Sequence, residues 1–180
     1  MAIRIINFLR SEMALLKYKV LYGKKFSFAW SVRVGKNFRI RISNGGSIKI
    51  EGRTLIRDNV ILHSSGGRIL LGKEIFLNDM VCLNSKGTIK IDDRVIIGQN
   101  VTFYDHDHDY KSASVRDNYV IGKIYVGFET WIGSQCCILK GSDIGSRCVI
   151  GAQSIVKEKI LDNTIYYQKR VKTIRRIEKC

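Results

Sequence analysis

Residues 126–156 read V-G-F-E-T-W-I-G-S-Q-C-C-I-L-K-G-S-D-I-G-S-R-C-V-I-G-A-Q-S-I-V. An aliphatic residue recurs at every sixth position of this stretch, and a small residue stands four positions after each of the first five. A helix has a period near 3.6 residues and a strand a period of 2, so a period of six indicates neither of them alone. The aliphatic residues are Val126, Ile132, Ile138, Ile144, Ile150 and Val156, and the small residues are Thr130, Cys136, Ser142, Cys148 and Ser154.

This period predicts an all-β solenoid in which each hexad forms one short strand and one corner. The aliphatic residue and the small residue of each hexad point into a narrow interior, and the second is small because that interior is crowded. A Gly follows most of the aliphatic residues, where we expect it to allow a tight bend. Three hexads form one triangular coil, and stacked coils share one continuous core.

The same phase extends upstream, with coils beginning at Ile50, Leu71 and Ile91, which are 21 and 20 residues apart. Residues 26–49 alternate between apolar and polar side chains and predict a first, irregular coil. The next coil begins 35 residues after Ile91, which is far more than one coil needs. The excess predicts a loop over residues 104–124, and a long loop leaving a regular scaffold is a common location for function.

The composition restricts the partners and the compartment. The formal net charge of +15 favours anionic partners, namely phosphates, anionic lipid or nucleic acid. The five cysteines have neither disulfide nor metal-ligand spacing, which indicates a reducing compartment and predicts a cytoplasmic protein. No stretch is long and apolar enough to span a bilayer, so any membrane contact is expected to be peripheral, at the inner face.

The two ends of the chain differ from the repeats. Residues 1–25 predict an amphipathic helix with an apolar face at Ile5, Leu9, Leu16 and Val20. This helix either caps the open end of the solenoid or contacts another copy, which we favour, or it lies on a membrane surface. We expect the β-helix to occupy residues 26–160 and a basic tail to occupy residues 161–180.

Three motifs carry a resemblance to a known family. The chain contains W-I-G-S, then I-L-x-G-x-x-I-G, then V-I-G-A-x-S-I-V, and these resemble the hexapeptide-repeat acyltransferases, particularly the maltose, galactoside and surface-polysaccharide O-acetyltransferases. The resemblance implies a left-handed parallel β-helix and a homotrimer with active sites between neighbouring solenoids. It also implies direct transfer of an acetyl group from acetyl-CoA to a sugar hydroxyl, in surface polysaccharide or lipopolysaccharide biosynthesis.

Acyl transfer from a thioester requires a general base, and histidine is the natural base near neutral pH. The loop contains His106 and His108, and the family histidine falls seven residues after Val101, at His108. His106 is the alternative base, because loop alignments slip by one or two residues. Asp105 is expected to contact the acceptor or to orient an imidazole. A metal site at H-x-H is the other interpretation, but the spacing to His63 does not match, and no metal is predicted.

The resemblance assigns further residues. Ser134 matches a serine beside the thioester carbonyl, Trp131 a wall of the acceptor or pantetheine groove, and Asn78 a residue that binds the acceptor sugar. For each of these, a purely structural role at the surface or at a coil corner remains open. The expected coenzyme A contacts are Ser134, Ala152, Lys157, Lys172, Arg175 and Trp131.

The C-terminal segment departs from the family pattern, because Gln168 and Arg170 stand where Gly and Pro are common. A solvated basic tail is therefore the alternative for Lys172 and Arg175.

Two other functions stay open at this stage. One is an N-acetyltransferase acting on a nucleotide-linked amino sugar, and the other is a non-catalytic basic solenoid that binds membrane or nucleic acid. No nucleic-acid recognition motif is present, so we expect no nucleic acid as a partner. The expected acceptor is a sugar or glycan, either lipid-linked or nucleotide-linked.

Overall fold

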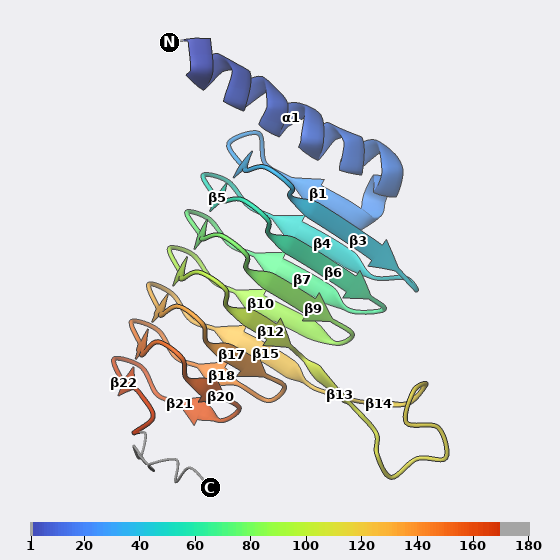
Figure 1. Ribbon diagram of the computed structural model, residues 1–180, viewed down its shortest axis with the longest axis vertical. Helices are drawn as coiled ribbons and strands as arrows, with labels where there is room; N and C mark the ends of the chain where they lie inside the picture. The colour runs from blue at the N-terminus through green and yellow to red at the C-terminus, as the bar shows by residue number, and fades with distance from the viewer. Residues whose placement is uncertain (1, 170–180) are drawn as a thin grey trace, which may run out of the picture.

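The computed structural model describes residues 2–169, with side chains described from Phe8 onward. A long helix, α1 (Ala2–Tyr22), is followed by a single 3-10 turn, η1 (Gly23–Lys25), and then by a parallel β-solenoid (Figure 1). The predicted left-handed parallel β-helix with an N-terminal helix is confirmed. Among the described residues, no helix combines the length and the hydropathy needed to cross a bilayer.

Three parallel sheets form the faces of the prism, and each coil contributes one strand to each sheet, except that the last described coil adds strands to sheets A and B alone. Sheet A contains β1 (Phe26–Phe28), β4 (Ser47–Ile50), β7 (Arg68–Leu71), β10 (Thr88–Ile91), β15 (Lys123–Val126), β18 (Asp143–Ile144) and β21 (Lys159–Ile160). Sheet B contains β2 (Arg33–Val34), β5 (Leu55–Ile56), β8 (Phe76–Leu77), β11 (Ile96–Ile97), β16 (Trp131–Ile132), β19 (Val149–Ile150) and β22 (Ile165–Tyr166). Sheet C contains β3 (Arg39–Ser43), β6 (Ile61–Ser65), β9 (Cys82–Ser85), β12 (Thr102–Tyr104), β17 (Cys137–Leu139) and β20 (Ile155–Val156).

The strand register matches the predicted coil starts. Ile50 pairs with Leu71, and Leu71 pairs with Ile91. Ile91 pairs with Val126 across the long insertion, and Val126 pairs with Ile144. The extra residues of the longer coils are therefore absorbed at the corners without shifting the strands, because a slip of one residue would turn every aliphatic side chain outward.

The interior is built as the hexads predict, since the aliphatic residues and the small residues Thr130, Ser142 and Ser154 are buried. The expectation for the glycines was wrong. At the corners the positive φ falls on the third residue after each aliphatic one, such as Arg147 at 55°, and not on the Gly that follows it directly. That Gly serves close packing between coils, since a Cβ on Gly133 would lie 2.7 Å from the backbone nitrogen of Ala152.

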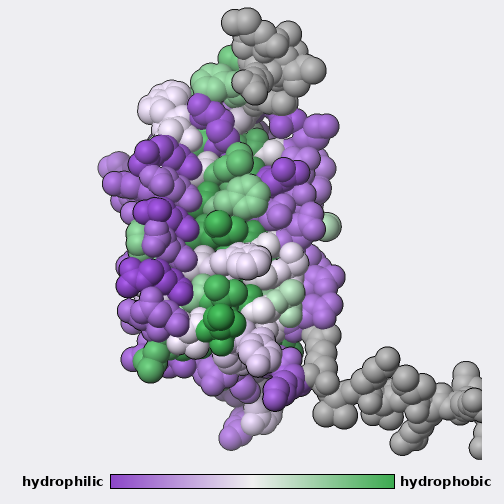
Figure 2. Space-filling model, turned by 90° about the vertical axis from the view of Figure 1, so that its left-hand side faces the viewer, coloured by the Kyte–Doolittle hydropathy of each residue, from purple (hydrophilic) through white to green (hydrophobic). Residues whose placement is uncertain are grey.

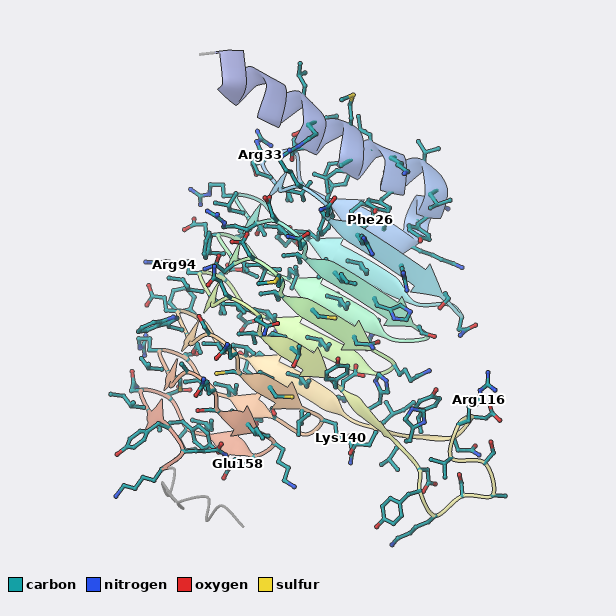
Figure 3. All side chains as sticks on the ribbon, in the orientation of Figure 1. Phe26, Arg33, Arg94, Arg116, Lys140 and Glu158 are labelled. Carbon is teal, nitrogen blue, oxygen red and sulfur yellow. The ribbon has the colours of Figure 1, made fainter. Side chains whose placement is uncertain are left out.

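The predicted loop leaves the solenoid at the corner between sheets C and A, as Figure 1 shows. It is an antiparallel hairpin in which β13 (His106–His108) pairs with β14 (Tyr119–Ile121). We call residues 105–122 the hairpin. Its tip, which includes Arg116, extends away from the coils, whereas Lys140 lies near its base (Figure 3).

Helix α1 covers the open end of the first coil and satisfies the backbone groups that the missing neighbour would bond. Ser11 Oγ accepts a hydrogen bond from the Val34 amide at 2.8 Å, and Tyr18 Oη donates to the Phe38 carbonyl at 3.1 Å. Arg33 forms an ion pair with Glu12 at 2.8 Å and reaches the helix from the coil below (Figure 3). The capping role is therefore observed, and it protects an edge that would otherwise be open to aggregation.

The face that α1 uses for capping is not the predicted apolar face. Leu15 is fully buried, and Ser11 and Glu12 are buried beside it, whereas the predicted residues Leu9, Leu16 and Val20 are exposed. The contact needs hydrogen-bonding side chains opposite the open backbone groups, so polar residues and tyrosines occupy it. Ile5 lies among the residues whose side chains are not described.

Candidate active site

Asp105 fixes the base of the hairpin to the solenoid. Its side chain is fully buried, and its carboxylate accepts hydrogen bonds from Ser85 Oγ at 2.6 Å, the Lys86 amide at 2.8 Å and the Gly87 amide at 2.9 Å. Its carbonyl accepts a fourth bond from the Gly122 amide at 2.7 Å, which closes the hairpin. With this burial Asp105 has no surface to offer an acceptor, so the expectation that it contacts the acceptor is replaced by an anchoring role.

His106 is oriented by that anchor. Its Nδ1 lies 3.0 Å from Asp105 Oδ1, and its side chain is 10% exposed. The carboxylate favours the tautomer with the proton on Nδ1, which leaves Nε2 as the acceptor. A buried carboxylate that orients an imidazole is found in many catalytic sites, but here little of the His106 ring reaches solvent.

His108 stands farther out on the same strand and is exposed. Its Nδ1 lies 2.7 Å from the Val115 carbonyl in the turn that joins the two strands, so the neutral tautomer that fits this contact carries its proton on Nδ1 and has Nε2 as the acceptor. Tyr119, its cross-strand partner, packs against both imidazoles, with ring centroids 4.6 Å from His108 and 5.5 Å from His106. The sequence reasoning missed Tyr119, although alternation along an antiparallel hairpin would have paired it with a histidine.

A polar row on the outer face of sheet C leads toward the hairpin. Arg41, His63, Asn84 and Tyr104 are paired one after another across neighbouring strands. Burial lowers the pKa of His63 below its usual 6.5, and the positive charges of Arg41, Lys86 and His106 lower it further. Such a site favours a neutral His63 and attracts anions. Coil register could have found this row, since its members recur at intervals of about one coil.

A second group of expected site residues lines the opposite edge of sheet C, at its corner with sheet B. A Cβ on Gly98 would touch the Ser134 amide, and one on Gly133 would touch the Ala152 amide, so these residues are stacked coil upon coil. Asn78 lies at the same corner one coil before Gly98, where its amide donates to the Ile97 carbonyl at 3.0 Å. We call Asn78, Ser134 and Ala152 the stacked edge.

Trp131 lies next to the stacked edge, on the outer face of sheet B. Figure 2 shows a vertical apolar stripe on this side of the molecule between rows of hydrophilic residues. Trp131 and its register partners Ile96 and Val149 belong to a shallow depression of about 560 Å³. The exposed indole is therefore available to a ligand that reaches this corner.

The remaining expected contacts do not join the stacked edge. Lys157 follows β20 and lies at the corner of sheets C and A, which is the hairpin's corner, two coils later. Lys172, Arg175 and the substituted position Arg170 lie outside the described residues. Gln168 is described, and its side-chain amide donates to the Ile155 carbonyl at 3.0 Å while its Oε1 accepts from the Ile155 amide at 3.2 Å.

The expected site residues thus form two groups that one chain does not bring together. The six residues from Ser134 to Leu139 cross sheet C, and the five steps between them span at most about 16 Å at roughly 3.3 Å per residue. The hairpin extends from the far side of that span and points away from the stacked edge of its own chain (Figure 1). Within residues 2–169, no group of three or more His, Cys, Asp or Glu side chains is arranged to hold a metal ion.

Comparison with known proteins agrees with the hexapeptide motifs. No family model matches the chain, but curated relatives do. The chain is 33% identical to the galactoside O-acetyltransferase of Escherichia coli over 110 residues, which cover 58% of this chain and 52% of the relative. It is 27% identical to WbbJ of E. coli, named as a lipopolysaccharide biosynthesis O-acetyl transferase, over 71% of each chain. The resemblance to the hexapeptide-repeat acyltransferases is confirmed.

The first relatives are longer than the region they share with this chain. Rv3034c of Mycobacterium tuberculosis, named as an acetyltransferase, is 22% identical over 85% of this chain and 59% of its own length. Among solved structures, AntD of Bacillus cereus has a TM-score of 0.70 and 23% identity, covering 91% of this chain and 90% of its own. AntD is an N-acyltransferase in complex with coenzyme A and dTDP-4-amino-4,6-dideoxyglucose, and at this identity the likeness concerns the fold.

Proposed function

We propose that this chain is an acetyl-CoA-dependent O-acetyltransferase that modifies a sugar hydroxyl, with His108 as the general base and with active sites shared between neighbouring copies in a homotrimer. The observation that carries the proposal is the imidazole of His108, held outward on the hairpin with its Nδ1 already bonded to the Val115 carbonyl. Its relatives are named as acetyltransferases, two of them as O-acetyltransferases, which supports the same class of reaction.

The chemistry is a direct transfer. His108 Nε2 accepts the proton of the acceptor hydroxyl as its oxygen forms a bond to the thioester carbonyl carbon. The resulting oxyanion is stabilised by a backbone N–H donor, which we assign to Ser134. Collapse of the tetrahedral intermediate breaks the bond between carbon and sulfur, and the imidazolium returns the proton to the leaving thiolate. The products are the acetylated sugar and free coenzyme A, with no covalent acyl-enzyme.

The buried pair of Asp105 and His106 has a supporting role in this proposal. Asp105 fixes the first residue of the hairpin, and His106, bonded to that carboxylate, supports the Tyr119 ring on which His108 packs. His106 is the alternative base, because its Nε2 is also free of the Asp105 contact. Its 10% exposure makes it the less accessible of the two imidazoles.

Coenzyme A is proposed to bind along the stacked edge, where the partly exposed Ser134 and the exposed Ala152 present backbone to a pantetheine arm. Ala152 is exposed, and its small side chain permits close approach; Trp131 forms an adjacent wall. Because Lys157 lies on the hairpin's corner, it would contact the coenzyme from the neighbouring copy. We retain Lys172 and Arg175 as phosphate contacts, since cationic side chains neutralise phosphate directly.

The acceptor class follows from the charge around the hairpin. Arg41, His63 and Lys86 lie close enough to one another for their charges to interact, next to His106. A lipid-linked or nucleotide-linked sugar carries phosphate, which this cluster would attract. Asn78 would bind the sugar from the stacked edge. N-acetyl transfer to an amino sugar is the alternative, and an acceptor panel containing both hydroxyl and amino sugars distinguishes the two.

The test measures release of coenzyme A thiol from acetyl-CoA with such a panel. We expect His108→Ala to lower turnover by about 10²- to 10⁴-fold, the range typical for loss of a general base, while coenzyme A still raises the melting temperature. His106→Ala should retain more activity than His108→Ala. The reverse order would assign the base to His106, and equal activity of both variants and wild type would exclude the hairpin from catalysis.

A second experiment tests whether the site is shared. Ala152→Trp should block the stacked edge, so it should be inactive alone, as should His108→Ala. Co-expressed in one cell, the two variants should regain activity at about a quarter of the sites, because random mixing pairs an intact hairpin with an intact neighbouring edge that often. Absence of any recovery in verified mixed trimers would place the complete site within one chain.

A further inference from the structure

The outer face of α1 has an unusual composition for a helix that already caps a core. Its inner face packs on the first coil, yet the side directly opposite carries Leu9, Met13, Leu16 and Val20. These four positions fall within a narrow arc of a helix with 3.6 residues per turn. Their exposed fractions are 52% for Leu9, 64% for Met13, 41% for Leu16 and 86% for Val20. We call these four residues the outer stripe.

The charge around the outer stripe is almost entirely positive. The first fifty residues contain eleven Lys and Arg and a single acidic residue, Glu12. Glu12 is buried and paired with Arg33, so the described part of α1 presents no carboxylate to solvent. Lys17, Lys24 and Lys25 are exposed on the helix and just after it. Most of the net charge of +15 is therefore concentrated at the capped end of the solenoid.

This combination identifies the surface that the stripe fits. A second copy docked through the same stripe would bring two strongly basic ends together, which like-charge repulsion disfavours. A nucleic acid would satisfy the lysines but would leave the four apolar side chains without a partner. An anionic lipid bilayer satisfies both features, because apolar side chains enter the headgroup region while lysines bind the negative surface.

The placement of the helix allows this contact without rearrangement. Helix α1 crosses the end of the solenoid (Figure 1). The outer stripe is exposed and lies on the side of the helix opposite the buried residues Ser11 and Leu15. Docking through the stripe would set the solenoid upright on the bilayer. The hairpin leaves the fourth coil, so three further coils at about 4.8 Å each would hold it roughly 15 Å above the helix. A sugar carried on a membrane lipid could reach that height.

We propose that the outer stripe of α1 docks this protein on an anionic membrane surface. The same helix therefore has two faces with two functions: the inner face closes the β-helix, and the outer face binds the bilayer. This inference stands apart from the proposed catalysis, since it rests on the helix and on the charge of the first coil. Its test measures vesicle binding and needs no turnover.

The experiment is co-sedimentation of the full-length chain with vesicles of phosphatidylcholine alone or with phosphatidylglycerol added. We expect binding to the anionic vesicles that falls at high salt. The variant Leu9→Ser, Met13→Gln, Leu16→Gln, Val20→Ser should bind about tenfold more weakly or less, because apolar insertion is lost. The matched control, Leu161→Gln with Tyr167→Gln, changes exposed apolar residues at the other end of the solenoid and should bind like wild type.

The charge is tested separately by two variants of equal net charge. Lys17→Gln with Lys24→Gln should weaken anionic-vesicle binding several-fold, as expected for loss of two lysines near a charged surface. Lys73→Gln with Lys159→Gln, on later coils, should have a smaller effect. Circular dichroism verifies that each variant is folded, and all of the changed residues are exposed.

Three results would overturn the proposal. The first is absence of wild-type binding to anionic vesicles at low salt. The second is undiminished binding by the folded outer-stripe variant. The third is an assembly of wild-type chains that dissociates in that variant, which would show that another copy covers the stripe.

Discussion

The coils and the hairpin are held in place by different numbers of neighbours. An interior coil residue such as Ile132 pairs with Ile97 in one direction and Ile150 in the other, and its side chain is fully buried. A hairpin residue such as His108 has a single cross-strand partner, and its side chain is exposed. The coils therefore gain stability cooperatively along the stack, whereas the hairpin depends on its own pairing and on Asp105. The coils therefore act as a stable scaffold, and the hairpin presents the exposed imidazole of His108 at its surface.

The largest effect on stability should come from disturbing the contact between coils. Gly133→Ala places a methyl group 2.7 Å from the Ala152 amide nitrogen and 2.9 Å from the Ile150 carbonyl oxygen, where backbone cannot yield. We expect a loss of about 3 kcal/mol in the free energy of unfolding, the upper range for overpacking. Denaturant unfolding measures it.

Gly151→Ala is the matched control for that substitution. It follows an aliphatic residue in the same way, but the nearest atom to its added methyl group is the Tyr167 Cβ at 3.0 Å, near the end of the described chain. We expect it to cost about 1 kcal/mol or less. Equal losses in the two variants would mean that these glycines do not act through coil spacing.

A smaller effect is expected at the joint between the two regions. Asp105→Asn keeps the shape but replaces one acceptor oxygen by a donor facing Ser85 Oγ and the amides of Lys86 and Gly87. We expect about 2 kcal/mol of destabilisation, the order of magnitude for an unsatisfied buried polar group. Hydrogen exchange should accelerate at the Gly122 amide, which bonds the Asp105 carbonyl.

Asp107→Asn controls for the change of charge. Asp107 is exposed, and its ion pair with Lys140 at 3.2 Å is a surface contact. We expect its loss to change the free energy of unfolding by less than about 1 kcal/mol and to leave the exchange of Gly122 unaltered. If Asp107→Asn accelerated that exchange as much as Asp105→Asn, the anchor would not lie in the buried carboxylate.

The coils were predictable from the sequence because each position in a coil repeats the environment of the position one coil earlier. One aliphatic residue in six therefore suffices to set phase, register and burial, as the pairing of Ile91 with Val126 across the insertion shows. The role of the glycines was not predictable in the same way, because period alone does not distinguish a turn from a close approach. The backbone of the next coil supplies that distinction at Gly133.

The candidate site was predictable only in part. The excess length located the hairpin and its histidines, but nothing periodic fixes which way a side chain points within it. Burial decides the role of Asp105, and that burial depends on the amides of Lys86 and Gly87, which come from the previous coil. The capping role of α1 was predicted, but not the face that makes it, since an apolar face indicates contact without indicating with what.

The smallest predicted effect concerns His63, a coil residue whose pKa responds to the charge of the hairpin residue His106. Burial and the charges of Arg41, Lys86 and His106 lower its pKa in the folded state below the usual 6.5. Below pH 6.5 the unfolded chain therefore binds a proton that folded His63 resists, so this residue makes stability fall as the pH drops through that value. His63→Asn should remove that contribution, and its unfolding free energy should decline less than that of wild type between pH 7 and pH 5. If the unfolding free energies of both proteins declined equally, the folded environment of His63 would not alter its protonation. The proposed positive field beside the hairpin would then lose its support.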